Sequence, residues 1–421
     1  MFEKKALALL VLTIVLPQNV GVSLPFLLPS LDLPRVAILG LHLTFAIYVW
    51  RNGYATIKDN LAIGEARRYL GYLGLLIAMS VFASLLSPSP GNSSLLWSLY
   101  YYLFGPGLAL ALFVLLGRPH QKNALSATLL VVCLCLSALA IVEYLVARDL
   151  FDFRNTGYLP GVKMFTHLTR VGKMTHGPFI SNHSLAVILL MFGGFCLVPV
   201  HFRNNLVRGI VLLIWFAAVL STQSLAALIA LAAMISMYLF VKRDIDTMLI
   251  SIAVSIICVT VILWLDDQQY WFHHYANYAT AGASNSGSLS GRVENYFEAI
   301  RLILERPFGY GSGAFFDPDR VVVDRLQIGE DRWRDAGIFT AIAIETGLAA
   351  VLVLLVMLGT AVKRIWIRDD RALGIILGLV GFAVFSLSSR TIVGLPYALF
   401  LCGLAISWSI GRQGDRAGPQ H

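Results

Sequence analysis

Charged residues are scarce in this chain of 421 residues, because Asp, Glu, Lys and Arg together make up only 13% of it. A soluble protein carries about 25%. Hydrophobic residues make up 57% of the chain, and many stand in unbroken runs such as residues 6–16 and 349–358. Such runs are apolar on every face, as expected for helices surrounded by lipid. The sequence therefore predicts an all-α polytopic membrane protein.

Three common catalytic motifs are also missing. The sequence contains no GxxxxGK[ST] phosphate-binding loop, no HExxH zinc motif and no CxxC pair. Their absence leaves ATP-driven transport and zinc proteolysis without support. The glycines of the run Gly309-Tyr-Gly-Ser-Gly313 follow a predicted helix and not a strand, so we interpret this run as a tight turn and not as a dinucleotide-binding loop. We expect no cofactor and no bound metal.

Nucleic-acid binding is disfavoured in spite of a net charge of +8. Lys and Arg are scattered between the apolar runs, whereas a nucleic-acid site would need them clustered on one soluble domain. This scatter is typical of membrane proteins, in which Lys and Arg gather in the cytoplasmic connections. Applied to the predicted spans, this rule places the N- and C-termini in the cytoplasm.

About twelve helical spans within one transmembrane domain, residues 1–421, are predicted from the apolar runs and the polar stretches between them. The spans lie at residues 6–28, 34–50, 69–86, 97–117, 124–147, 184–201, 207–221, 225–241, 247–265, 337–361, 372–389 and 391–411. The break at residues 221–224 decides the topology. If residues 207–241 formed one long helix, every later segment would change sides.

Two connections are long, residues 148–183 and residues 266–336, and the predicted topology places both outside. Loops of more than about 12–15 residues usually have a function or are disordered. The second loop is rich in aromatic residues and in both signs of charge, which indicates a folded segment.

An amphipathic helix is predicted within the second loop, over residues 290–306. Its apolar residues recur at helical spacing, and they are Val293, Phe297, Ile300 and Leu304. Ser290 can cap its start and Pro307 stops it. We expect this helix to lie on the membrane surface or over the mouth of the helix bundle.

Ionisable residues are rare inside the predicted spans, where Glu143 and Glu345 are the main ones. A proton or ion pump usually needs a chain of such residues through the bilayer. Arg, Lys and His are instead frequent in the exported segments. An enzyme that faces outward has no ATP, so it must use a substrate that arrives activated, such as a lipid-linked pyrophosphate sugar. Arg suits this substrate because its planar guanidinium pairs bidentately with phosphate oxygens.

Three segments resemble the O-antigen ligase and polymerase family. They read GRVENYFEAIRLILERPFGYGSGAF from Gly291, GPFISN from Gly177 and DAGIFTAIAIETG from Asp335. The resemblance implies a metal-independent glycosyltransferase with a GT-C-like fold and a large periplasmic loop in the bacterial inner membrane. Its donor and acceptor would be undecaprenyl-pyrophosphate-linked glycans, and its other partners would be membrane lipids, a chain-length regulator and a flippase.

Two departures from the ligase pattern favour a polymerase. Where a ligase would carry a His-Asn pair, this sequence has Ala336-Gly337 preceded by Asp335, which is more similar to polymerases of O-antigen or exopolysaccharide. The Arg that many family members carry after the Ser at the start of the eighth span is Leu225 here. We therefore predict a polymerase of lipid-linked repeat units. The alternatives are a ligase that transfers the polymer to lipid A core, and a transporter or flippase of lipid-linked sugars.

The resemblance also suggests roles for individual residues. Arg292 opens the amphipathic helix, where free backbone N–H groups and the helix dipole favour an anion, so it would neutralise the pyrophosphate leaving group. Its alternative role is a salt bridge to Glu294 or Glu298. Asp335 would accept the proton of the acceptor hydroxyl, or cap the tenth span. The substrate-binding candidates that could replace the missing Arg or contact the sugar are Arg170, Lys173, His176 and Arg390.

Overall fold

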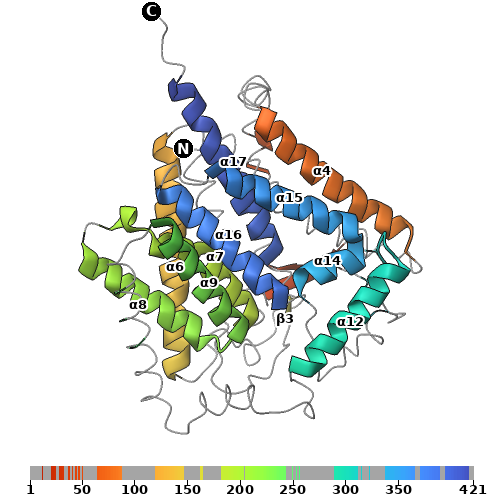
Figure 1. Cartoon of the computed structure of the whole chain (residues 1–421), viewed down its shortest axis with the longest axis horizontal. Coiled ribbons are helices and arrows are strands. Elements are labelled where there is room, and N and C mark those ends of the chain that lie inside the picture. Colours follow the sequence, from red (N-terminus) through yellow and green to blue (C-terminus); the bar gives the residue numbers. More distant parts are fainter. Residues whose placement is uncertain are drawn as a thin grey trace, which may run out of the picture.

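The computed structural model describes the chain in separate stretches. These are residues 20–24, 28–32, 64–87, 119–146, 162–164, 182–202, 204–242, 289–311, 337–365, 370–388 and 394–416, together with a few isolated positions. Their helices are α4 (Gly64–Leu85), α6 (Pro119–Val146), α7 (Asn182–Leu197), α8 (Asn205–Ser221), α9 (Leu225–Lys242), α12 (Leu289–Glu305), α14 (Ile338–Thr346), α15 (Leu348–Ile365), α16 (Asp370–Ser388) and α17 (Gly394–Arg416), with a short 3-10 helix at Pro199–His201. The predicted helical architecture is thus confirmed for the described residues outside 20–24, 28–32 and 162–164 (Figure 1).

A small antiparallel sheet was not predicted. Its strands are β1 (Val20–Leu24), β2 (Leu28–Asp32) and β3 (Val162–Met164), in the order β2-β1-β3. The first predicted span, residues 6–28, is therefore wrong at its end. Pro25 follows β1 directly in the sequence and disfavours a continuous helix, and β2 pairs antiparallel with β1 from Leu28.

Helices suited to a membrane are present where spans were predicted. By length and composition, three described helices can cross a bilayer, with apolar segments at Arg67–Leu85, Ala124–Leu145 and Leu225–Lys242. Five shorter apolar helices lie at Asn182–Leu197, Asn205–Ser221, Leu348–Lys363, Arg371–Leu387 and Tyr397–Ile406. Each of these segments overlaps a predicted span. The spans predicted at 34–50, 97–117 and 247–265 lie outside the described residues, apart from isolated positions.

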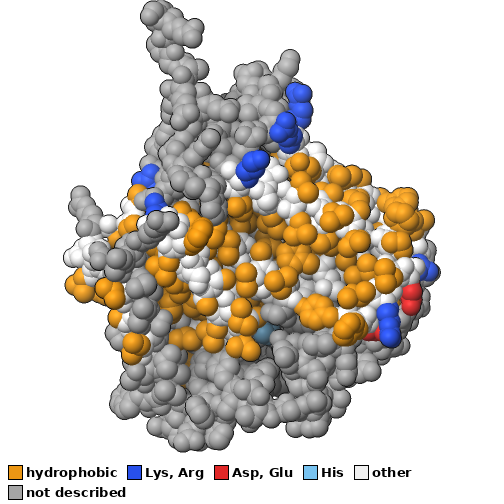
Figure 2. Space-filling model, viewed as in Figure 1, with side chains coloured by type: hydrophobic (Ala, Val, Ile, Leu, Met, Phe, Trp, Pro, Cys, Tyr) orange, Lys and Arg blue, Asp and Glu red, His pale blue; other side chains and the backbone are white. Residues whose placement is uncertain are grey.

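The surface agrees with a lipid environment. Figure 2 shows a broad band of hydrophobic side chains, with Lys and Arg along its upper rim and also, beside acidic side chains, at its lower right edge. Large apolar side chains are exposed on many helices, and Phe240 on α9 exposes 76% of its surface. A soluble monomer rarely exposes contiguous apolar area on this scale. The band is therefore the surface that lipid chains would cover.

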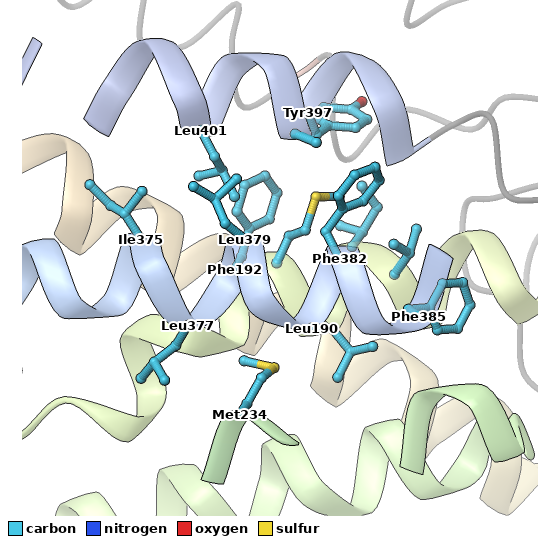
Figure 3. Packing of buried hydrophobic residues seen from close by; sticks show 14 of the residues in the cluster. Leu190, Phe192, Met234, Ile375, Leu377, Leu379, Phe382, Phe385, Tyr397 and Leu401 are labelled. Atoms are coloured by element: carbon cyan, nitrogen blue, oxygen red, sulfur yellow. The ribbon is translucent and has the colours of Figure 1, made fainter. Parts of the chain in front are cut away.

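Helix α7 is the centre of the bundle. Residues 184–197 are all buried, because α6, α8, α9, α16 and α17 surround this helix. Its contact with α16 is close: a Cβ atom on Gly378 would collide with the carbonyl oxygen of Met191. Small residues let two helix backbones approach in this way, which is the usual basis of helix packing in membranes. Figure 3 shows the apolar side chains that α7, α9, α16 and α17 contribute to this core.

The chain breaks between α8 and α9, where the sequence predicted a break. Helix α8 ends at Ser221 and α9 begins at Leu225, so residues 207–241 are not one helix. Gln223 has a φ of 53°, which no residue of a right-handed helix adopts. At the other end of this helix pair, Arg208 is buried and donates hydrogen bonds to the Leu197 carbonyl (2.7 Å) and to the Tyr238 hydroxyl (3.2 Å).

Candidate functional site

The tenth predicted span is not a single helix. The apolar pattern predicted one helix over residues 337–361, but the structure divides it into α14 and α15 at Gly347. Gly347 has a φ of 98°, a conformation that ends a right-handed helix. The prediction was wrong because an apolar run shows burial on all sides and does not show where the backbone turns.

The segment Pro307–Gly311 fills the break between the two helices. The Tyr310 N–H donates to the Ile344 carbonyl (2.8 Å) and the Gly311 N–H to the Glu345 carbonyl (3.0 Å). In return, the Leu348 N–H donates to the Pro307 carbonyl (3.2 Å). Backbone groups freed at membrane depth must find such partners, because lipid offers none. Discontinuous helices of this kind often line substrate sites in membrane proteins.

Two glycines allow this close approach. Gly309 has a φ of 91°, and a Cβ atom there would lie 2.5 Å from the Glu345 carbonyl oxygen. A Cβ atom on Gly347 would lie 2.7 Å from the Pro307 carbonyl oxygen. The Gly309 N–H also bonds to the Arg306 carbonyl (2.9 Å), which closes a turn at the end of α12. The glycine run is thus the expected tight turn, and its packing explains why glycine is needed there.

Helix α12 is the predicted amphipathic helix. It begins at Leu289, so Ser290 lies inside the helix and is not its N-cap residue. Ala299 and Leu302 are buried on the side that packs against α14, whereas Leu304 exposes 74% of its surface and Phe297 exposes 63%. The helix therefore carries apolar residues on two faces, one towards the bundle and one outward.

The outward face of α12 continues onto α4. The rings of Phe308 and Phe82 meet edge to face, with centroids 6.0 Å apart. Arg306 donates to the Leu86 carbonyl (3.5 Å) and stacks over the ring of Tyr310. Phe82 and Leu86 belong to the exposed apolar side chains at the end of α4. The contact joins α12 to the hydrophobic band of the bundle.

Three helices meet beside Tyr296, in the middle of α12, and we call this meeting place the mouth of the bundle. The Tyr296 hydroxyl donates to the Leu387 carbonyl near the end of α16. Gly337, directly before α14, packs against the same place, since a Cβ atom there would lie 2.8 Å from the Leu387 carbonyl oxygen and 2.9 Å from that of Ser386. The mouth thus brings together α12, the start of α14 and the end of α16.

Polar groups line the neighbouring part of the mouth. The Asn182 side chain at the start of α7 donates to the Thr222 carbonyl (2.8 Å). His183 Nδ1 lies 3.2 Å from the Ser224 hydroxyl, and the His183 ring lies 6.2 Å from the ring of Phe385 on α16. The α8–α9 turn and the start of α7 therefore adjoin the end of α16.

The predicted site residues stand beside these elements in the chain. Arg292 is in the first turn of α12, four residues before Tyr296, so both residues lie on one face of the helix. The side chain of Arg292 lies outside the described residues, as do all of Asp335, Arg390, Arg170, Lys173 and His176.

Asp335 and Arg390 lie close in the sequence to the described helices α14 and α16. Asp335 precedes Gly337 by two residues, and Gly337 itself occupies the N-cap position of α14. The capping role suggested for Asp335 is therefore wrong. Arg390 follows the last residue of α16 by two positions. Glu298, one suggested partner of Arg292, forms an ion pair with Arg301 at 3.3 Å.

Sequence reasoning missed the break in the tenth span and the contacts of Tyr296 with α16. No signal in the sequence identifies α16 as the partner of Tyr296. The described residues contain no cluster of three or more His, Cys, Asp or Glu side chains suited to a metal.

These features define a helical membrane protein with a broken helix at its mouth and an amphipathic helix beside it. The family model described as O-antigen ligase matches residues 209–355, from α8 into α15. The resemblance to the O-antigen ligase and polymerase family is thereby confirmed for this part of the chain, and members of that family are enzymes that transfer polysaccharide. No curated protein matches the chain.

Proposed function

We propose that the protein polymerises undecaprenyl-pyrophosphate-linked repeat units into O-antigen or exopolysaccharide at the periplasmic face of the bacterial inner membrane. In this proposal it is a metal-independent glycosyltransferase with about twelve spans and a GT-C-like fold. The family match carries the proposal, because residues 209–355 include α12, the Pro307–Gly311 segment and α14, which build the mouth.

The chemistry follows from the elements around the mouth. The acceptor hydroxyl oxygen attacks C1 of the donor sugar, the bond between C1 and the phosphate oxygen breaks, and the pyrophosphate leaves with the electron pair. Arg292, in the first turn of α12, neutralises the departing charge together with free N–H groups of that turn. Asp335 takes the proton of the acceptor hydroxyl. A positioned hydrogen-bond donor such as Arg292 stabilises the transition state by about 3–4 kcal/mol.

The packing of Gly337 favours the polymerase over the ligase. In the ligase pattern, Asn would stand at this position after a His. Gly337 has a φ of 76°, and a Cβ atom would lie 2.8 Å from the Leu387 carbonyl oxygen and 3.1 Å from the Tyr296 hydroxyl. Any larger residue must displace the end of α16 or Tyr296 of α12. The departure from the ligase pattern is therefore built into the packing of the mouth.

Mass spectrometry of lipid-linked glycans, in cells with and without the gene, tests the proposal. We expect single repeat units on undecaprenyl pyrophosphate to accumulate in the deletion strain. Long chains on the same lipid would favour the ligase alternative, and an unchanged pool would refute both and favour transport.

Arg292→Lys, returned to the deletion strain, tests the role of the guanidinium. Lysine keeps the charge but loses the bidentate geometry, so we expect short products at normal protein level. Arg301→Lys is the matched control, because Arg301 lies on the same helix with its side chain 73% exposed and should tolerate the change. Wild-type product length in both variants would argue against the role of Arg292.

A further inference from the structure

The turn between α8 and α9 is buried although all four of its residues are polar. Ser221, Thr222, Gln223 and Ser224 are each exposed by 3% or less. Burying polar groups costs free energy unless they find hydrogen bonds. Three of these residues do so: Ser221 and Thr222 donate to carbonyls of α8, and Ser224 pairs with His183.

Gln223 differs from its neighbours in two ways. Its φ of 53° makes it the one non-glycine residue with positive φ among the described residues. Within the same part of the chain, neither Nε2 nor Oε1 of its side chain has a hydrogen-bond partner. A strained backbone and a buried amide both reduce stability, and strain of this kind is concentrated at functional sites. Gly at this position would avoid both costs.

The surroundings of Gln223 are neutral hydrogen-bonding groups. Asn182 reaches the Thr222 carbonyl, and the His183 imidazole stands beside the Ser224 hydroxyl. His183 is partly buried, and it is the more exposed member of the pair that it forms with Ser224. Leu225 follows Ser224 in the chain, and it occupies the position where many members of the family carry an Arg. The turn therefore offers amide, imidazole and hydroxyl groups and no cation of its own.

We infer that Gln223, together with His183, forms a binding site for sugar hydroxyls of the glycan substrate, beside the part of the mouth where α12 would receive the phosphates. This inference rests on the proposed function. An amide supplies both a donor and an acceptor, which suits neighbouring hydroxyls of a sugar ring. A phosphate would instead require positive charge. The strain at Gln223 is retained because it holds the amide at this position.

Substitution by glycine separates binding from stability. Gln223→Gly relieves the backbone strain and removes the amide, so the thermal unfolding midpoint should rise while glycan binding falls. Gln223→Asn keeps an amide and tolerates positive φ, so it should retain part of the binding. Gly209→Ala on α8 is the matched control, because no atom lies within 4 Å of the added Cβ and the change stabilises a helix without touching the site.

The probe is the repeat-unit oligosaccharide released by partial hydrolysis from the surface polysaccharide of the host. Binding is measured as the concentration-dependent rise of the unfolding midpoint of the purified protein. We expect affinity to fall about tenfold in Gln223→Gly, as for the loss of one or two hydrogen bonds, and to stay unchanged in Gly209→Ala. Equal affinity in Gln223→Gly and wild type, or no binding by wild type, would overturn the inference.

The outcomes also distinguish this inference from the proposed function. An unchanged glycan pool in the deletion strain, with binding that depends on Gln223, would refute the polymerase and leave the sugar site. Accumulated repeat units in the deletion strain, with full affinity in Gln223→Gly, would refute the sugar site and leave the polymerase.

Discussion

Replacing Gly309 by alanine should displace the 307–311 segment from the break between α14 and α15. The added Cβ atom would lie 2.5 Å from the Glu345 carbonyl oxygen and 2.9 Å from the Gly347 nitrogen. Both are backbone atoms, so no side chain can rotate away. The segment must move, and its hydrogen bonds from Tyr310 and Gly311 to α14 are then lost or lengthened.

The size of the effect follows from these contacts. An alanine in the left-handed region costs about 1–2 kcal/mol, and two backbone hydrogen bonds contribute about 1 kcal/mol each. Gly309→Ala should therefore destabilise the protein by about 3–4 kcal/mol. Gly359→Ala on α15 is the control, because no atom lies within 4 Å of its added Cβ. That change should instead stabilise the helix by up to about 1 kcal/mol.

Thermal unfolding of the purified proteins in the same detergent measures both effects, and the glycan pool of the complemented deletion strain measures function. We expect a lower midpoint and shorter products for Gly309→Ala, and an equal or higher midpoint with normal products for Gly359→Ala. If the midpoint of Gly309→Ala equals that of wild type, the contact between the segment and the broken helix is not as described.

Two further predictions concern the bundle. Arg208→Gln should lower the unfolding midpoint, because the hydrogen bonds to the Leu197 carbonyl and the Tyr238 hydroxyl are lost, at about 1.5–3 kcal/mol for a charged donor; an unchanged midpoint would mean that the buried guanidinium contributes nothing. Gly378→Leu should prevent α16 from approaching α7 at Met191, and the variant should be degraded in cells; normal protein abundance would contradict the close packing of these helices.

Hydrophobic patterning predicted most helices but not how they are interrupted. The sequence located α12 within a residue at each end, because helical spacing and Pro307 are local signals. It missed the break at Gly347, since the energy that stabilises the break comes from a segment more than thirty residues earlier in the chain. It also missed strand β1, where the partner strand β3 lies far along the sequence.

In the candidate site too, the sequence predicted local features but not the contacts between distant segments. Arg292 was predicted from the resemblance and from its place near the start of a helix; α12 begins three residues before it, and its role stays a prediction. The packing of Gly337 and Tyr296 against the end of α16 depends on contacts between distant segments, which a single sequence does not reveal. Gln223 also gave no signal, because its strain and burial exist only in the folded chain.

The broken helix has a consequence for how the protein is made. Helix α14 has nine residues and is about 14 Å long, less than half the thickness of the hydrocarbon core, whereas α15 has eighteen and spans about 27 Å. Of the two helices, α15 alone is long enough to reach across most of that core. Helix α14 forms its contact with the 307–311 segment only when the N–H groups of that segment pair with its carbonyls. Because residues 307–311 precede α14 in the chain, this partner has already been synthesised when α14 is made.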